Sequence, residues 1–191
     1  MSRTHRGVCS FFKVAPTLLF AAALSGCVVS FTNPLPASQP IGRDQRLLGK
    51  WEGQDEQGNY GWVRFENGPK NEINVFASGD WGYQNPALRM VTTKISGSDF
   101  MILRLNDPNN DKDYMVARYS TNDDKLTVCL LNVEKVKEAI KKRKLKGKVD
   151  YSPSGGAIIT ESSKNVITFL GSPNSKDLFI CLSELKKVPA K

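Results

Sequence analysis

The stretch that decides the fold is YGWVRFE, residues 60–66. In an extended chain Trp62, Arg64 and Glu66 fall on one side, and Val63 and Phe65 fall on the other. Similar short runs occur at residues 47–53, 72–78, 88–95, 99–105, 113–120 and 125–131. Clusters of Asn, Asp, Gly, Pro and Ser separate several of these runs and indicate turns. The pattern predicts a mainly β domain with an antiparallel sheet, either a closed barrel or a sandwich.

One amphipathic helix interrupts the strands. NVEKVKEAIKKRKLKG, residues 132–147, has Asn132 as a candidate N-cap and Gly147 as a stop signal, which predicts a helix over about 133–146. Val133, Val136 and Ile140 lie on its narrow apolar stripe, and lysines occupy the rest of its surface. Further strands are expected around residues 156–160, 165–170 and 177–183.

The triplet Gly49-Lys50-Trp51 resembles the G-x-W signature of lipocalins and their calycin relatives. The resemblance implies a small antiparallel barrel with a ligand cavity and a helix late in the chain. A second lipocalin motif, of the T-D-x-x-Y type, has no counterpart, because Thr121 is followed by Asn122. Trp51, Trp62 and Trp81 are expected either to line a ligand cavity or to fill the core.

The N-terminus has the pattern of a targeting segment. Arg3, Arg6 and Lys13 precede an apolar run over 14–24, and no acidic residue precedes Gly26. The run ends in Leu24-Ser25-Gly26-Cys27, which resembles the lipobox of bacterial lipoproteins. An uncleaved transmembrane helix and a soluble secreted product are the competing interpretations, but polar and small residues dilute the apolar segment below the length needed to span a bilayer.

The lipoprotein resemblance implies cleavage before Cys27, a diacylglyceryl group on its sulfur and acylation of the new amino terminus. Residues 1–26 are then a signal peptide, 27–46 a lipidated N-terminus with a Pro-rich tether, and 47–191 one domain. Several acyl chains on one residue hold a protein stably at a membrane. Val28 follows the cysteine in place of the aspartate that often marks inner-membrane retention, so the resemblance favours the outer membrane, facing the periplasm.

Removal of the signal segment changes the charge and the cysteine count. The net charge falls from +8 to +5, with 24 basic and 19 acidic residues left. Residues 133–148 hold eight of these basic residues and two acidic ones, so the rest of the mature chain is nearly neutral. Because the positive charge is confined to this one segment, nucleic acid is not an expected partner. Of four cysteines, Cys129 and Cys181 remain as thiols, which either pair in an oxidising compartment or stay as two separate buried thiols.

The residues left for catalysis or metal binding are few. The single histidine, His5, lies in the signal segment, which excludes histidine-based triads and histidine-ligated zinc from the mature chain. The loop that starts at Asp107 lacks the Gly and Glu of an EF-hand, because Lys112 and Arg118 stand at those positions. The S-x-x-K pattern that starts at Ser183 has no accompanying K-T-G element. No cofactor or metal is expected.

These observations predict a lipid-anchored envelope protein without enzymatic activity that binds a protein partner or a small apolar ligand. An alternative is a structural or assembly factor that docks on anionic envelope components, and another is an envelope hydrolase without histidine. The docking patch is expected at Lys137, Lys141, Lys142, Arg143 and Lys144. A solvated helix face that only keeps the domain soluble is the competing interpretation of this patch. The sequence leaves the oligomeric state open.

Overall fold

The computed structural model of the 191-residue chain describes residues 28–33, 41–54, 60–77, 88–105, 114–152, 155–182 and 184–189. Its strands are β1 (Val29–Phe31), β2 (Gly49–Gln54), β3 (Tyr60–Asn67), β4 (Ile73–Ala77), β5 (Leu88–Ile95), β6 (Ser98–Leu105), β7 (Met115–Asn122), β8 (Lys125–Leu131), β9 (Gly147–Val149), β10 (Ala157–Ile159), β11 (Phe179–Cys181) and β12 (Leu185–Lys187). Its helices are α2 (Val133–Lys141), α3 (Ser163–Gly171) and the 3-10 turns η1 (Gln45–Leu47) and η2 (Pro173–Leu178).

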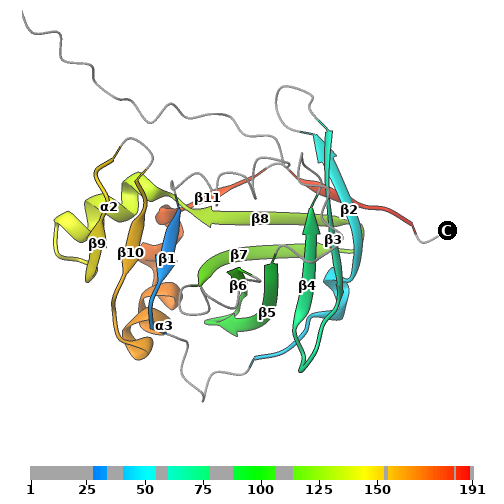
Figure 1. Cartoon of the computed structure of the whole chain (residues 1–191), viewed down its shortest axis with the longest axis horizontal. Coiled ribbons are helices and arrows are strands. Elements are labelled where there is room, and N and C mark those ends of the chain that lie inside the picture. Colours follow the sequence, from blue (N-terminus) through cyan, green and yellow to red (C-terminus); the bar gives the residue numbers. More distant parts are fainter. Residues whose placement is uncertain are drawn as a thin grey trace, which may run out of the picture.

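Eight antiparallel strands close into a barrel (Figure 1). The order around the barrel is β8-β12-β2-β3-β4-β5-β6-β7, and β7 pairs with β8 to complete the circle. β8 pairs with β12 near Leu126 and with β11 near Leu130, so β11 extends the sheet beyond the closed wall. The barrel rather than the sandwich is therefore the correct alternative, and closure leaves few exposed strand edges.

Alternation along β3 matches the pattern of its sequence. Val63 and Phe65 point into the barrel and are buried, whereas Arg64 and Glu66 are exposed on its outer face. The interior is filled by one apolar cluster to which most barrel strands contribute. Its members are Leu47, Trp51, Val63, Phe65, Ile73, Val75, Leu88, Met90, Met101, Leu103, Ala117, Tyr119, Leu126 and Leu185.

A second layer covers one side of the barrel wall. β1, β10 and β9 form a three-stranded sheet that packs, with α2 and α3, on the outer face of the wall near β6, β7 and β8 (Figure 1). Phe100 and Ile102 of β6 point outward into this second apolar cluster, and Phe31 and Ile159 meet them from the covering layer. β6 is thus buried on both faces, which explains its nearly continuous apolar sequence.

The predicted tether over 27–46 is wrong for the residues of that range that the structure describes. Phe31 is fully buried in β1, where its ring stacks on Tyr114 with centroids 5.4 Å apart. Leu47 follows in η1, which begins at the Asp44 cap and closes one end of the barrel interior. Residues 28–33 and 41–48 are therefore part of the folded domain, because their apolar side chains contribute to both cores.

Two predictions about helices need correction. α2 ends at Lys141 rather than near 146, because Arg143 adopts a left-handed conformation with φ 56°. The amides of Arg143 and Lys144 donate to the carbonyls of Ile140 and Ala139, which is a Schellman motif. The segment 165–170, predicted as a strand, lies in α3, which Ser162 caps by accepting a hydrogen bond from the Asn165 amide.

Within the part of the chain that the structure describes, none of the helices has both the length and the apolar character needed to cross a membrane.

Candidate functional site

The basic segment at the C-terminal end of α2 is the largest concentration of charge predicted from the sequence. Three exposed cations of this segment, Lys141, Arg143 and Lys144, form no ion pair with any residue that the structure describes. Lys146 is also exposed and lies between them and β9. We call Lys141, Arg143, Lys144 and Lys146 the basic turn.

The other two residues of the predicted patch have partners on their own helix. Lys137 is half-buried and lies 3.1 Å from Glu134, and Lys142 lies 2.5 Å from Glu138. The Lys142 hydrogen bond and its positive charge hold the pKa of Glu138 below its ordinary value. The structure thus divides the predicted patch into two neutralised lysines and three cations that face solvent.

The shape of the basic turn follows from the residues that anchor it. Val136 and Leu145 are buried in the covering layer on either side of the turn. A Cβ on Gly147 would lie 2.7 Å from Ile140 Cδ1 and 2.6 Å from the Ile158 carbonyl oxygen, so α2 packs closely on the start of β9. The turn is therefore held at both ends, and its cations are presented from a fixed backbone.

The N-terminal end of β1 lies beside the turn that joins β9 to β10. The Ala157 amide donates to the Val28 carbonyl at 3.0 Å, and the Asp150 amide donates to the Gly156 carbonyl at 3.1 Å. Tyr151, in the same turn, is 80% exposed. Sequence reasoning missed Tyr151, although a single aromatic residue in a Ser-Pro-Ser-Gly-Gly turn is a recognisable surface signal. Cys27, the predicted lipidation site, lies outside the described residues.

The tryptophans do not line an open cavity together. Trp51 is fully buried, its Nε1 donates to the Leu47 carbonyl at 2.7 Å, and Lys187 Nζ lies 5.1 Å from its ring centroid. Trp62 is half-buried on the outer face of the barrel, where Lys50 Nζ lies 5.5 Å from its ring centroid. Trp81 lies outside the described residues. Trp51 is therefore a core residue beneath η1.

The G-x-W triplet has a specific backbone role at this end of the barrel. Gly49 has φ 117°, which a residue with a side chain adopts only with strain. A Cβ there would also lie 3.4 Å from Lys187 Cε. Lys187 Nζ in turn donates to the Arg46 carbonyl at 3.0 Å. The Lys187 side chain of β12 therefore contacts both the triplet and η1.

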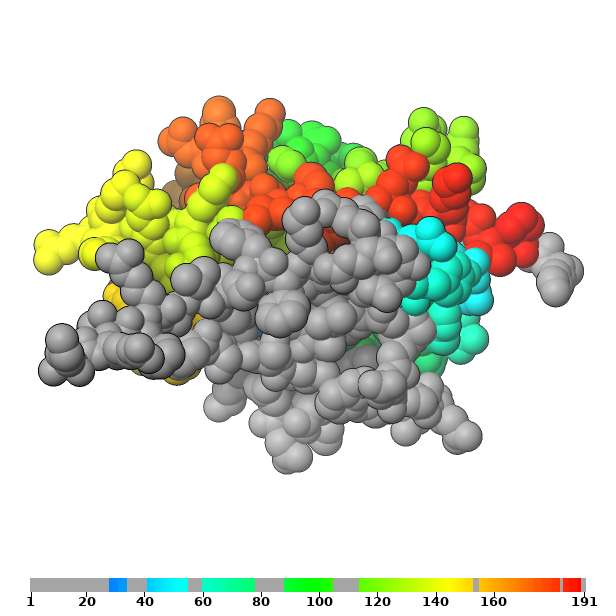
Figure 2. All heavy atoms as spheres, turned by 90° about the horizontal axis from the view of Figure 1, so that it is seen from above, coloured from blue at the N-terminus to red at the C-terminus, as the bar shows by residue number. Residues whose placement is uncertain are grey.

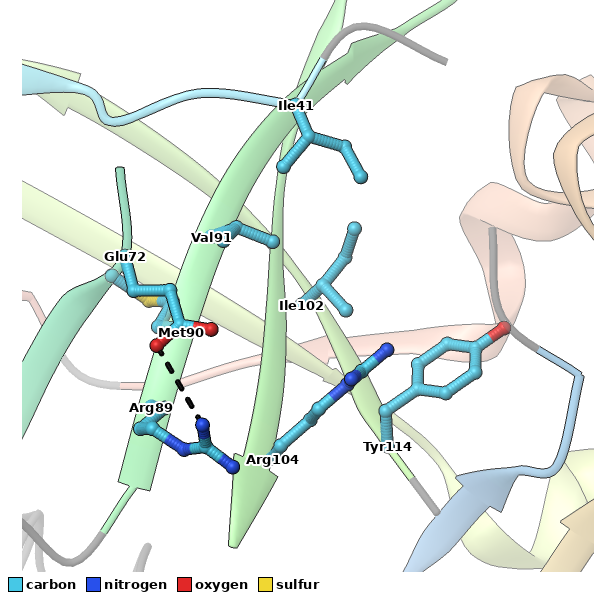
Figure 3. A pocket seen from close by; sticks show the side chains of 8 residues that line it. All are labelled: Ile41, Glu72, Arg89, Met90, Val91, Ile102, Arg104 and Tyr114. Carbon is cyan, nitrogen blue, oxygen red and sulfur yellow. Dashed lines mark ion pairs between the residues drawn. The ribbon is translucent and has the colours of Figure 1, made fainter. Parts of the chain in front are cut away.

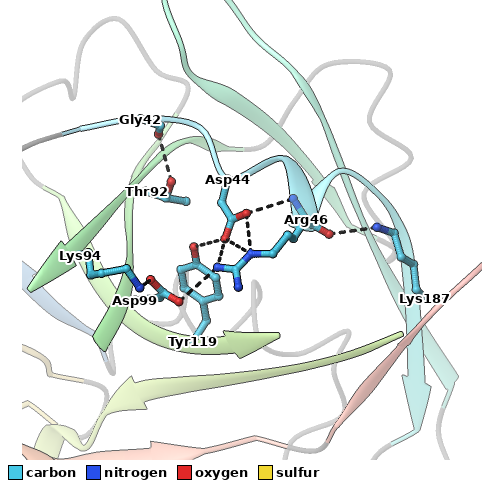
Figure 4. Close-up of polar contacts among 8 residues, drawn as sticks. All are labelled: Gly42, Asp44, Arg46, Thr92, Lys94, Asp99, Tyr119 and Lys187. Carbon is cyan, nitrogen blue, oxygen red and sulfur yellow. Dashed lines mark hydrogen bonds and ion pairs between the residues drawn. The ribbon is translucent and has the colours of Figure 1, made fainter. Parts of the chain in front are cut away.

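A polar network seals the same end of the barrel (Figure 4). Tyr119 Oη donates to Asp44 Oδ2 at 2.7 Å, and Arg46 donates to both Asp44 oxygens and to Asp99. Burial by itself raises the pKa of Asp44, but the hydrogen bonds from Arg46 and Tyr119 outweigh it and the pKa lies below its ordinary value. Burial, followed by the bond to Asp44, raises the pKa of Tyr119. Each member has an internal partner, which indicates a structural role.

A hollow of about 210 Å³ lies on the outer face of β5 and β6 (Figure 3). Arg89 and Arg104 are directly opposite each other on these strands, and Arg89 Nη1 lies 3.8 Å from Glu72 Oε2. The residues around the hollow are Ile41, Glu72, Arg89, Met90, Val91, Ile102, Arg104 and Tyr114. Tyr114 Oη donates to the Asn33 carbonyl, so this tyrosine also holds the chain that follows β1. The hollow therefore lies outside the barrel and not in the cavity that the lipocalin resemblance implies.

Cys129 and Cys181 are directly opposite each other on β8 and β11 and are joined by a disulfide with an S–S distance of 2.06 Å. Of the two interpretations left open by the sequence, the structure contains the bonded one. A disulfide in a folded domain is typical of proteins outside the reducing cytosol.

The described residues contain no group of three or more His, Cys, Asp or Glu side chains placed to hold a metal ion. The loop that starts at Asp107 and the side chain of Ser183 lie outside the described residues. Comparison of the chain with models of protein families, with curated proteins and with solved structures gives no match.

Proposed function

We propose that this protein is a lipid-anchored component of the bacterial cell envelope, acylated at Cys27 and held on the periplasmic side of the outer membrane. The observation that carries the proposal is the lipobox-like run Leu24-Ser25-Gly26-Cys27 after a basic and apolar N-terminus. The Cys129–Cys181 disulfide supports it independently, because an oxidising compartment outside the cytosol would preserve such a bond.

We further propose that the domain acts by binding at its surface rather than by catalysis. The mature chain would contain no histidine, and the polar network around Asp44 is occupied by internal hydrogen bonds. Apolar side chains fill the described barrel interior, which favours a partner outside the barrel over a small apolar ligand inside it. The basic turn favours an envelope assembly or structural role in which this surface docks on an anionic component.

Metabolic labelling tests the anchor. The full chain is expressed in a bacterial host fed an alkyne-bearing palmitate, with Cys27→Ala as the control, and the N-terminal peptide is identified by mass spectrometry. We expect label and acyl mass on Cys27 in the wild-type protein and neither in the variant. An unmodified N-terminal peptide in the wild-type protein would contradict the proposal.

Membrane fractionation tests the location separately. The lipidated wild-type protein is expected in the outer-membrane fraction. A Val28→Asp variant places at position 28 the residue that often marks inner-membrane retention in such proteins, and we expect it in the inner membrane of an enterobacterial host. If wild type and variant distribute identically while both are lipidated, the proposed outer-membrane location is wrong although the anchor stands.

A further inference from the structure

The distance between the predicted lipidation site and the folded domain is very short. Val28 alone separates Cys27 from β1, which begins at Val29. Consecutive Cα atoms are about 3.8 Å apart, so the Cα atoms of Cys27 and Val29 are at most about 7 Å apart. Val29 is buried, and β1 is paired along its whole length with β10. An anchor at Cys27 would therefore hold the domain against the bilayer, with a single residue as the linker.

The surface around the three-stranded sheet of β1, β10 and β9 carries groups suited to a membrane interface. Tyr151 is exposed in the adjoining β9–β10 turn, and aromatic side chains of this kind are common at the level of lipid headgroups. α2 lies next to the same sheet, and the basic turn leads from its last residue into β9, at the end of these three-residue strands opposite to Val28 (Figure 1). Residues of α2 and the basic turn, yellow-green to yellow, occupy one margin of the molecule in the view from above (Figure 2).

The acidic groups of this region do not cancel its charge. Glu134 and Glu138 are paired with Lys137 and Lys142, whereas the cations of the basic turn form no ion pair with a described residue. Glu161 lies beside the turn, where its Oε1 accepts from the Lys146 amide at 2.9 Å, and it offsets only one of the four positive charges. Asp150 is the acidic residue of the β9–β10 turn. Hydrogen bonds from Ser152 lower its pKa, and the nearby charge of Lys137 lowers it further. The net charge that faces outward here is positive, which complements acidic phospholipid headgroups.

We infer that the domain lies directly on the bilayer that holds its acyl chains, with the basic turn and Tyr151 against acidic phospholipid headgroups. The inference rests on the proposed lipidation of Cys27 and adds an orientation and a lipid class to it. The docked surface comprises α2, the basic turn and the β9–β10 turn, whereas the barrel end formed by the β7–β8 turn and β12 faces away.

Amine footprinting of the lipidated wild-type protein tests this orientation. The protein is inserted into preformed vesicles of phosphatidylcholine, with or without phosphatidylglycerol, and labelled with a membrane-impermeant amine reagent. We expect labelling of Lys141, Lys144 and Lys146 to fall about fivefold in the phosphatidylglycerol vesicles, the factor expected from the attraction that one cation gains near an anionic surface. Labelling of Lys125, at the start of β8, serves as the internal reference and should not change.

Salt and charge variants separate docking from general crowding at the surface. High salt should abolish the protection, because the screening length falls to about 3 Å at 1 M. The variant Lys141→Gln/Arg143→Gly/Lys144→Gln should lose the protection of Lys146. The control Lys164→Gln/Lys176→Gln/Lys186→Gln removes the same charge from other exposed sites and should keep it. Melting temperatures no lower than that of the wild type establish that both variants fold.

The outcomes distinguish the two proposals. Mass spectrometry of the N-terminal peptide in the same samples reports the acyl groups on Cys27. If that peptide is acylated but the basic turn is labelled equally in both kinds of vesicle, the orientation is wrong and the proposed anchor stands. If the peptide is not acylated, the proposed anchor fails, and the orientation fails with it.

Discussion

Asp44 is the residue on which the sealed end of the barrel depends. It caps η1 through the Arg46 amide at 3.0 Å and receives bonds from the Arg46 guanidinium and the Tyr119 hydroxyl. Its side chain is 13% exposed, so these bonds are partly shielded from water. A carboxylate held in this way links the segment before β2 to β7, on the other side of the barrel.

The lowered pKa of Asp44 has a consequence for stability at acid pH. Because the pKa is lower in the folded than in the unfolded chain, Asp44 stabilises the fold at neutral pH, and this contribution is lost as the pH falls below the ordinary value of 3.8. We expect Asp44→Asn to lower the free energy of unfolding by about 2 kcal/mol at pH 7. Below about pH 4, the free energy of unfolding of the variant should fall less steeply with pH than that of the wild type.

Urea titrations between neutral and acid pH measure both effects. Asp123→Asn, at an exposed position in the β7–β8 turn, is the matched control and should change stability by less than about 0.5 kcal/mol. If Asp44→Asn showed the same pH dependence as the wild type, the assigned role of Asp44 would be wrong.

Arg143 adopts the conformation that usually belongs to glycine at a helix end. Arg143→Gly should therefore stabilise the domain by about 0.5–1 kcal/mol, because it removes the steric cost of a left-handed residue. Lys142→Gly removes an equal charge one position earlier, where φ is −78°, and should destabilise by a similar amount. Thermal melts of the two variants should shift in opposite directions, and a shift in the same direction would contradict the assignment.

At the scale of elements, β1 connects the barrel to its covering layer. Phe31 exchanges backbone hydrogen bonds with Tyr114 and is fully buried between the two layers. We expect Phe31→Ala to cost about 3–5 kcal/mol of unfolding free energy, the range for removing a buried aromatic ring. Ile41→Ala, at a position 47% exposed, should cost far less. Denaturant midpoints of both variants provide the measurement, and similar values for the two would mean that residues 28–33 are a tether after all.

The elements that sequence predicted correctly are those with one clear period. YGWVRFE alternates because the barrel buries one face of β3, and the same logic identified the runs that became β2 and β4–β8. β1 has three residues, too few to show a period, and its burial depends on contacts with distant β10. The strand predicted around 165–170 is wrong: Val166, Ile167 and Phe169 have strong strand preferences, but the Ser162 cap and the buried pair Val166 and Leu170 determine a helix.

The candidate site was predictable in its chemistry but not in its arrangement. The density of lysines after Asn132 identified the basic region from composition alone. Composition does not reveal that Lys137 and Lys142 pair along the helix while Arg143 turns outward, since this depends on where α2 ends. The nearness of Val28 to the β9–β10 turn depends on a pairing across more than a hundred residues, which a local pattern does not encode.

At the scale of the whole molecule, the disulfide fastens β11 to the barrel wall. Cys129 and Cys181 are 52 residues apart, and loop-closure entropy for that separation gives about 4 kcal/mol of stabilisation. We expect Cys129→Ala/Cys181→Ala to lower the free energy of unfolding by about this amount relative to the oxidised wild type. Urea titrations with and without reductant supply the comparison, since the reduced wild type should behave like the variant. A loss below about 1 kcal/mol would show that packing alone holds β11.

The closure of the barrel imposes an order on events during synthesis. β2 pairs on one side with β12, where Lys187 lies opposite Trp51. The pairing of β2 is therefore completed only by a strand that is synthesised more than a hundred residues later. Until β12 has been synthesised, the wall between β2 and β8 lacks one strand and the barrel cannot close. A chain with this strand order therefore reaches its closed topology only after β12 has been made, however early the other strands pair.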